Sequence, residues 1–556
     1  MSLQLRFIPS VPEDTVRVAR VAFPDGNPYL RLRDELGTIF HDVDFADLYP
    51  RTGQPALAPW RLALVTVLQF REDLSDRSAA DAVRARIDWK YLLGLELTDP
   101  GFDATVLCQF RSRLIAGGGE EVLLEKLLVR CKTLGLLKAR GRQRTDSIHV
   151  LARVRATNRL GCVIETMRQA LNSLAIVAPD WLREHSPAEW VERYGRRPDE
   201  SRLPTAQGDR QAYACQVGED GHALLAAIYG PDSPSWLGEV PVVETLRRVW
   251  VQQFSVEAGC VQWRTDKDGV PPARLFISSP HDVEARYSKK STTTWVGYKV
   301  HLTETCMDEA PHLIVHVATT PAPVADGDVT PTIHEALRGA DLLPGKHMAD
   351  TAYVDAELLA DSRRDYGVDL IEPTRPDYKW QSRAGDGFAA SEFAIDWDRR
   401  HATCPEGRAS VSWSPAVDRG HNEVIKIKFS AKDCGACPSH ARCTKAKRRS
   451  ITVRRRDQYE ALQAARSREA SEEYRAEYNR RAGIEGTISQ GVRACGLRRS
   501  RYIGEAKAHL QHVATATAMD VVRITDWRIT DWLADRPREV TRTSAFTRLM
   551  AAADAA

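Results

Sequence analysis

Residues 145–152, TDSIHVLA, are the stretch of sequence that decides the fold. This run is short, apolar and partly β-branched, which predicts a buried β-strand. It also contains Asp146, and an ionised carboxylate inside a buried strand is costly unless it is paired or bound to a metal. The sequence therefore predicts a strand with a functional acid within it.

Strand and helix patterns alternate on the C-terminal side of this strand. Strand-like runs occupy 295–303 (WVGYKVHLT) and 313–319 (LIVHVAT), a helix is expected at 329–337, and shorter strands lead into Asp350 and cover 368–371. This order predicts an α/β fold with a mixed sheet. On the N-terminal side, residues 55–115 have helical spacing. Pro59 is expected to open one helix, and a second helix is expected to run from an N-cap at Ser78 to an end near Gly94.

These patterns divide the chain into seven segments. We expect a helical N-terminal domain, a core interrupted by two insertions, and a tail: 1–130 (helical domain), 131–156 (first part of the core), 157–280 (helical insertion), 281–372 (core continued), 373–467 (Cys-rich, basic insertion), 468–525 (a long helix and the end of the core) and 526–556 (tail).

Length and composition limit the class of protein. The chain has 556 residues, 43% hydrophobic and 28% charged, which is typical of globular proteins and predicts about three or four folded units. No stretch approaches the roughly 18 apolar residues of a membrane helix, and no secretory signal is visible at the N-terminus. We therefore expect a cytoplasmic protein without a membrane partner.

The formal charge is only +3, but the basic residues are clustered. Residues 130–144 contain six basic side chains and no acid, residues 445–456 contain seven and no acid, and a third group lies at 493–501. One such run is equally well explained as a solvated surface. Three of them favour a polyanionic partner. The candidate phosphate contacts are Arg142, Arg144, Lys299, Arg454, Arg455 and Arg456.

A helix expected from residue 468 onward carries a second group of chemically informative residues. Tyr474, Tyr478, Arg481 and Glu485 lie at offsets of 0, 4, 7 and 11, which places them in one stripe. Alone, the stripe is more typical of a salt-bridged helix face than of a functional site. Together with Asp146 and Asp350, Glu485 completes a set of three acids suited to two Mg²⁺ ions, or Mn²⁺, in phosphoryl transfer.

Several motifs resemble those of bacterial insertion-sequence DDE transposases, most closely the insertion-sequence 1182 family. The sequences TDSIHV at Asp146 and ADTAYVD at Asp350 resemble the first two acid motifs, and Tyr478-x2-Arg481-x3-Glu485 resembles the Y-x2-R-x3-E signature. The signature lysine would fall at Val492, so Arg493 is its candidate substitute. Residues 79–114, 285–287 and 297–301 resemble further parts of the family, and the resemblance covers nearly the whole chain.

The resemblance implies an RNase H-like core in which Asp146, Asp350 and Glu485 bind the metal ions and Tyr478 and Arg481 contact DNA. It also implies that the helical N-terminal domain, residues 1–130, binds DNA. It implies Mg²⁺-dependent cleavage at the element's terminal inverted repeats and joining of the 3′-OH to target DNA, by a homodimer on double-stranded DNA at the nucleoid. Two alternatives remain open at this point. The chain could be a decayed or domesticated DNA-binding protein, or an RNase H-like nuclease without strand transfer.

A cysteine cluster marks the second insertion. Cys434-x2-Cys437-x5-Cys443, with Cys404 upstream, offers four thiols in a loop-like region, which predicts a structural Zn²⁺ site. Four unrelated thiols are the alternative. A zinc-deaminase pattern fits poorly, because Asp433 precedes Cys434 where that pattern has proline, and His421-x-Glu423 leads into a strand-like run.

Overall fold

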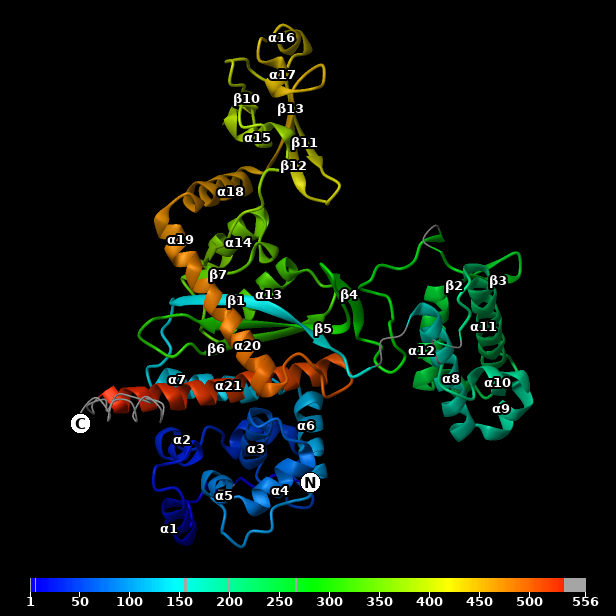
Figure 1. Cartoon of the computed structure of the whole chain (residues 1–556), viewed down its shortest axis with the longest axis vertical. Coiled ribbons are helices and arrows are strands. Elements are labelled where there is room, and N and C mark those ends of the chain that lie inside the picture. The colour runs from blue at the N-terminus through cyan, green and yellow to red at the C-terminus, as the bar shows by residue number, and fades with distance from the viewer. Residues whose placement is uncertain are drawn as a thin grey trace, which may run out of the picture. The chain divides into compact units, whose positions relative to one another are not determined.

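The computed structural model describes residues 2–5, 7–154, 158–198, 201, 203–265 and 268–534 (Figure 1). The chain forms two compact units, one made of residues 1–137, 306–313 and 514–556 and the other of residues 138–305 and 314–513. The last helix, α21 (Glu505–Ala534), belongs in part to each. The predicted tail at 526–556 begins as the end of this helix, and its remainder from 535 lies outside the described residues.

The first unit begins with α1 (Glu13–Ala22) and α2 (Pro28–Leu36), followed by helices arranged around a nearly all-buried helix. That helix, α3 (Pro59–Arg71), opens with proline at its first position, where the missing N–H costs no hydrogen bond. The predicted cap at Ser78 is wrong, because Ser75 accepts the hydrogen bond from the Ser78 N–H. The single helix predicted from Ser78 to Gly94 is interrupted at Arg86, where the backbone is extended, and Gly94 ends the second of the two helices with a left-handed φ of 61°. The other helices are η1 (Asp42–Leu48), α4 (Asp76–Ala85), α5 (Ile87–Leu93), α6 (Thr105–Ala116) and α7 (Val122–Thr133).

The second unit is built on a six-stranded mixed sheet, so the α/β prediction is confirmed. The central strand β1 (Arg142–Leu151) pairs antiparallel with β5 (Thr293–Thr305) and parallel with β7 (Lys346–Met348). Outside these lie β6 (Ile314–Pro321), antiparallel to β5, and β8 (Asp369–Ile371), parallel to β7. The order of strands across the sheet is β6-β5-β1-β7-β8. The sixth strand, β4 (Arg286–Lys290), pairs with the start of β5.

Helices cover the two faces of this sheet. Thr145 on β1 bonds to His347, whose ring lies 2.9 Å from His334 of α13 (Asp326–Gly339), and His334 contacts Ser362 of α14 (Ala356–Tyr366). Asp146 faces the opposite side, because neighbouring strand residues alternate. That side is covered by α20 (Gly483–Cys495), which packs on β1 (Figure 1).

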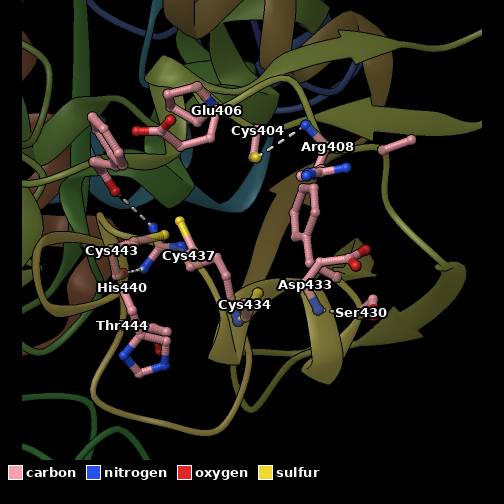
Figure 2. A pocket seen from close by; sticks show the side chains of 15 residues that line it. Cys404, Glu406, Arg408, Ser430, Asp433, Cys434, Cys437, His440, Cys443 and Thr444 are labelled. Atoms are coloured by element: carbon pink, nitrogen blue, oxygen red, sulfur yellow. Dashed lines mark hydrogen bonds between the residues drawn. The ribbon is translucent and has the colours of Figure 1, made fainter.

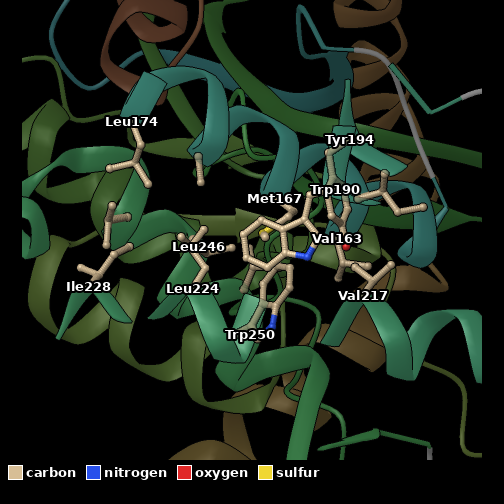
Figure 3. Close-up of a cluster of buried hydrophobic side chains, with 14 of the residues drawn as sticks. Val163, Met167, Leu174, Trp190, Tyr194, Val217, Leu224, Ile228, Leu246 and Trp250 are labelled. Atoms are coloured by element: carbon tan, nitrogen blue, oxygen red, sulfur yellow. The ribbon is translucent and has the colours of Figure 1, made fainter. Parts of the chain in front are cut away.

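The first insertion is mainly helical but also contains a β-hairpin that the sequence pattern did not predict. Its helices are α8 (Arg159–Val177), α9 (Pro179–His185), α10 (Glu189–Tyr194), α11 (Gln207–Ile228), η3 (Ser235–Glu239) and α12 (Pro241–Gln253), and the hairpin is β2 (Phe254–Glu257) with β3 (Cys260–Trp263). Figure 3 shows Met167, Leu246 and Trp250 in its core. Gly221 lets α11 approach α12 closely, since an added Cβ would lie 2.1 Å from the Trp250 ring.

The second insertion forms small sheets around its own apolar cluster. Phe393, Ile427, Phe429 and Ile451 are buried there. Its elements are α15 (Trp380–Arg383), η6 (Ala390–Glu392), β9 (Ala394–Asp396), β10 (His401–Thr403), β11 (Ser412–Val417), β12 (Glu423–Lys428), α16 (Ala431–Gly435), α17 (His440–Cys443) and β13 (Ser450–Arg454), and α18 (Arg456–Glu469) follows. Strands β11, β12 and β13 form one antiparallel sheet.

Candidate active site

Two neighbouring parallel strands position the two aspartates. Arg144 of β1 is the partner of Met348 in β7, so the register extended by two residues brings Asp146 level with Asp350. Each carboxylate accepts the N–H of its following residue, at 2.8 Å from Ser147 and 2.7 Å from Thr351. Asp350 thereby caps the short helix η5 (Thr351–Tyr353), which fixes the chain where β7 ends.

Arg481 joins the first aspartate to the glutamate. Its Nη2 lies 2.6 Å from Asp146 Oδ2 and its Nη1 lies 3.1 Å from Glu485 Oε1. The side chains of Arg481 and Asp146 are 14% and 16% exposed, whereas Glu485 is 65% exposed. Burial raises the pKa of Asp146, although the Arg481 charge acts against this, and nearby Asp350 raises it further. A buried acid of this kind is stabilised by a cation.

The segment that carries Arg481 and Glu485 is not one helix, so the prediction of a single continuous stripe is wrong. It consists of α19 (Glu472–Asn479), the 3₁₀ turn η7 (Arg480–Ala482) and α20. Within α19 the rings of Tyr474 and Tyr478 stack in parallel, with centroids 5.8 Å apart. Tyr478 is half-buried, and burial raises its pKa, so its hydroxyl remains protonated at neutral pH.

The structure places Arg144 inside the protein rather than on a phosphate-binding surface. Its residue exposure is 5%, and its Nη2 lies 2.6 Å from Glu304 Oε1 in β5. Glu304 is fully buried and also accepts the Thr487 hydroxyl of α20 at 2.6 Å. The sequence analysis missed Glu304 and Thr487. The only available signal was an acid near the end of an apolar strand, which no local pattern connects to Arg144.

The other basic candidates differ in how they are placed. Arg142 pairs with Glu477 at 2.8 Å, and Lys299, 14% exposed, pairs with Asp326 at 2.5 Å. Arg493 is exposed on α20, one residue after the partly buried Val492.

The basic candidates of the second insertion lie at the junction of β13 and α18. Arg454 is partly buried at the end of β13. Arg455 and Arg456 are exposed and contact acids, Glu423 and Asp398 among them, at 3.2 and 3.1 Å. Exposed ion pairs of this kind are weak and can exchange for phosphate contacts.

The four clustered cysteines line one pocket, as Figure 2 shows. Cys404 Sγ accepts the Arg408 N–H at 3.4 Å within a tight turn in which Gly407 has a φ of 77°. Cys434 Sγ accepts the Arg449 N–H at 3.5 Å. His440 also lines the pocket, but its Nε2 contacts the Ala446 carbonyl at 3.0 Å.

The described ranges contain neither a ready metal-binding group nor a membrane-spanning helix. Among these residues, no three His, Cys, Asp or Glu side chains are arranged as a ready metal site. At the acids, Arg481 lies between Asp146 and Glu485; at the cysteines, the thiols share a pocket without meeting at one point. Within the same residues, no helix is both long and apolar enough to cross a membrane.

Comparisons with known proteins gave two family matches. Residues 403–525 match the family described as a transposase DDE domain, and residues 18–113 match a transposase domain designated DUF772. A search of curated proteins found no match. The first match contains the clustered cysteines and Glu485, and the second covers most of the helices of the first unit. Both matches support an insertion-sequence transposase.

Proposed function

We propose that this chain is a DDE transposase that cuts the ends of a bacterial insertion sequence and joins them to target DNA. The observation that carries the proposal is the shared contact of Asp146 and Glu485 with Arg481, beside Asp350 on the neighbouring strand. The strand order, with three antiparallel strands followed by two parallel ones, is that expected of an RNase H-like core. The two transposase-family matches point to the same function.

The donor set at this site fits Mg²⁺ or Mn²⁺, because carboxylate oxygens are the ligands these hard cations prefer. Asp146, Asp350 and Glu485 would hold the ions, and bound metal would stabilise the charge on the attacking and leaving oxygens. Arg481 is a guanidinium suited to bidentate phosphate contact, so we assign it to the DNA strand being cut. Tyr478, whose hydroxyl remains protonated, can donate to a neighbouring phosphate oxygen.

We assign the remaining DNA contacts to exposed basic groups. These are Arg493 on α20 and Arg455 and Arg456 at the start of α18, together with the partly buried Arg454 at the end of β13. Arg142 and Lys299 form ion pairs with Glu477 and Asp326, and we assign them to DNA binding through these pairs. Arg144 is buried and is therefore not assigned to DNA binding. Synapsis of two ends would require a homodimer on DNA. Membership of the insertion-sequence 1182 family remains a prediction.

We also propose that Cys404, Cys434, Cys437 and Cys443 hold a structural Zn²⁺. Two of these sulfurs already accept backbone N–H groups, which stabilise a thiolate in the way that a metal-bound cysteine requires. Phe388 and Phe429 also line the pocket, and both belong to or pack on the apolar cluster of this insertion. Zinc would hold together the insertion whose strand β13 leads directly into Arg454, Arg455 and Arg456.

The function is tested by comparing wild type with Glu485→Gln on DNA that carries the element's own end, with Mg²⁺. The variant is expected to bind this DNA normally while losing at least about 100-fold in cleavage and strand transfer, since a metal-binding carboxylate has gone. Glu473→Gln, the same change on the exposed side of α19, is the control and should keep full activity.

Three outcomes of this experiment distinguish a transposase from a nuclease and from a non-catalytic DNA-binding protein. Cleavage followed by joining in wild type supports the transposase. Products that are cut but never joined identify a nuclease. Binding without cutting identifies a non-catalytic DNA-binding protein and contradicts the proposal.

A further inference from the structure

A buried polar cluster beneath the candidate active site has no role in the chemistry described above. Arg144 donates to Glu304 through Nε at 2.7 Å and Nη2 at 2.6 Å, and the Thr487 hydroxyl donates to the other Glu304 oxygen at 2.6 Å. The three residues are 5%, 0% and 4% exposed. They link three elements: β1, which carries Asp146, the neighbouring strand β5, and α20, which carries Glu485.

The same arginine also contacts the backbone where the helix is interrupted. Arg144 Nη1 donates to the carbonyl of Arg480, the first residue of η7. A short 3₁₀ turn inside a helical segment commonly marks a place where a side chain competes for the helix hydrogen bonds. Arg144 is such a side chain, so its contact explains why α19 and α20 do not form one continuous helix.

The first residue of α20 is shaped to this contact. A Cβ on Gly483 would lie 2.1 Å from Arg144 Nη1, so any other residue at this position would force the guanidinium to move. Residues 480 and 483 thus both contact Arg144, and Arg481 lies between them in sequence. The position of the Arg144 guanidinium therefore sets the direction in which the side chains of Arg481 and Glu485 point.

Burial of a charge pair alone is a poor reason for its presence. The loss of hydration opposes the attraction between the charges, and replacement by apolar residues is often neutral for stability. A buried pair that bonds to two separate elements does, however, fix their relative position. Here those elements are β1 and α20, which carry Asp146 and Glu485, the two acids that pair with Arg481.

We propose that Arg144, Glu304 and Thr487 form a positioning clamp that holds Arg481 and Glu485 at the correct distance from Asp146 for metal binding. The inference rests on the proposed function, since it assigns a role within that same site. None of the three residues touches substrate, so each acts through the acids above it. Thr487 is the most informative member, because its removal leaves the Arg144–Glu304 pair intact.

The test compares wild type, Thr487→Val, Thr487→Ser and the control Ser489→Ala, a partly buried residue on the same helix. Two quantities are measured on the full chain. Titration calorimetry with Mg²⁺ alone gives the affinity of the metal without DNA, and DNA cleavage across a range of Mg²⁺ concentrations gives the rate and the metal requirement.

Thr487→Val is expected to be less stable than wild type, because the buried Glu304 loses a donor, but to stay folded and bind DNA under the assay conditions. Its Mg²⁺ affinity should fall about 5- to 10-fold, and its cleavage should need correspondingly more metal. Thr487→Ser, which keeps the hydroxyl, is expected to restore both values, and Ser489→Ala to change neither. Unchanged Mg²⁺ affinity in Thr487→Val overturns the clamp. A lower rate at unchanged metal requirement also overturns it, because that result describes a smaller folded fraction.

The proposed function can fail independently of the clamp. If wild type binds Mg²⁺ but never cleaves DNA, the transposase proposal is contradicted while the calorimetric comparison of Thr487→Val with wild type still decides the clamp. If wild type neither binds Mg²⁺ nor cleaves DNA, both proposals are contradicted.

Discussion

At the scale of single residues, Glu372 at the end of β8 is the most unusual acid of the described chain. It is 1% exposed, and neither carboxylate oxygen has a hydrogen-bond partner within the described residues. Burial raises its pKa to about 8, against the attraction of Arg468. Glu372 is therefore largely protonated at neutral pH, next to the segment that carries Tyr474.

This shift predicts a pH dependence of stability. Because the folded-state pKa lies above the unfolded value of about 4.3, the neutral acid favours folding below that pH, and the contribution is lost as pH rises through 8. The free energy of unfolding of wild type relative to Glu372→Gln should fall by about 1.4 kcal/mol per pH unit between about pH 4.5 and 8. Denaturant titrations at several pH values measure it. A constant difference contradicts the prediction, and the exposed Glu392→Gln serves as control.

The sequence predicted individual acids better than their partners. Asp146, Asp350 and Glu485 stand in recognisable local motifs, and the structure places Asp146 and Glu485 on one guanidinium. Glu304 and Thr487 could not be found this way, because their significance depends on an antiparallel register between β1 and β5 that local sequence does not encode. For the same reason Arg144 was assigned to the surface, although it is buried.

At the scale of elements, the start of α20 yields a prediction that opposes helix propensity. Alanine at a helical glycine normally stabilises by about 0.5–1 kcal/mol. In Gly483→Ala the new methyl group would displace the Arg144 guanidinium, which Glu304 and the Arg480 carbonyl hold in place. We expect a loss of about 1–3 kcal/mol in the free energy of unfolding, as for other overpacked sites. Gly486→Ala is the control, since open space surrounds that position; equal effects of both substitutions contradict the prediction.

The hydrophobic periodicity of the sequence predicted whether a segment is a helix or a strand more reliably than it predicted where the segment ends or is interrupted. The strands predicted at 145–152 and 295–303 appear as β1 and β5, and the helix expected at 329–337 lies within α13. The break at Arg480 was not predicted, because its cause is a side chain 336 positions away in sequence. In the second insertion, the strand-like run that follows Glu423 appears as β12. Shorter strands such as β9 and β10 were not predicted, since they are stabilised mainly by a small apolar cluster of their own.

At the scale of the whole molecule, the proposed zinc site predicts that part of the chain can unfold on its own. Purified protein should contain about one zinc per chain, and Cys434→Ser should lose it, whereas Cys260→Ser, at an exposed thiol of the first insertion, should retain it. A strong chelator should increase amide exchange in β10–β13 while the protection of β1 and β5 is unchanged, because zinc binding supplies folding free energy locally. Protein without zinc and with unchanged exchange after chelation contradicts the proposal.

The ion pair between Asp146 and Arg481 joins residues 335 positions apart, which has a consequence for synthesis of the chain. The strand β1 leaves the ribosome long before its partner β5, and the segment with Arg481 and Glu485 emerges last of the three site-forming segments. Contacts between such distant parts form slowly, because a long loop must close before they stabilise anything. If the proposed function holds, a chain that has not yet been extended past Glu485 would lack one of the three metal-binding acids and could not cut DNA.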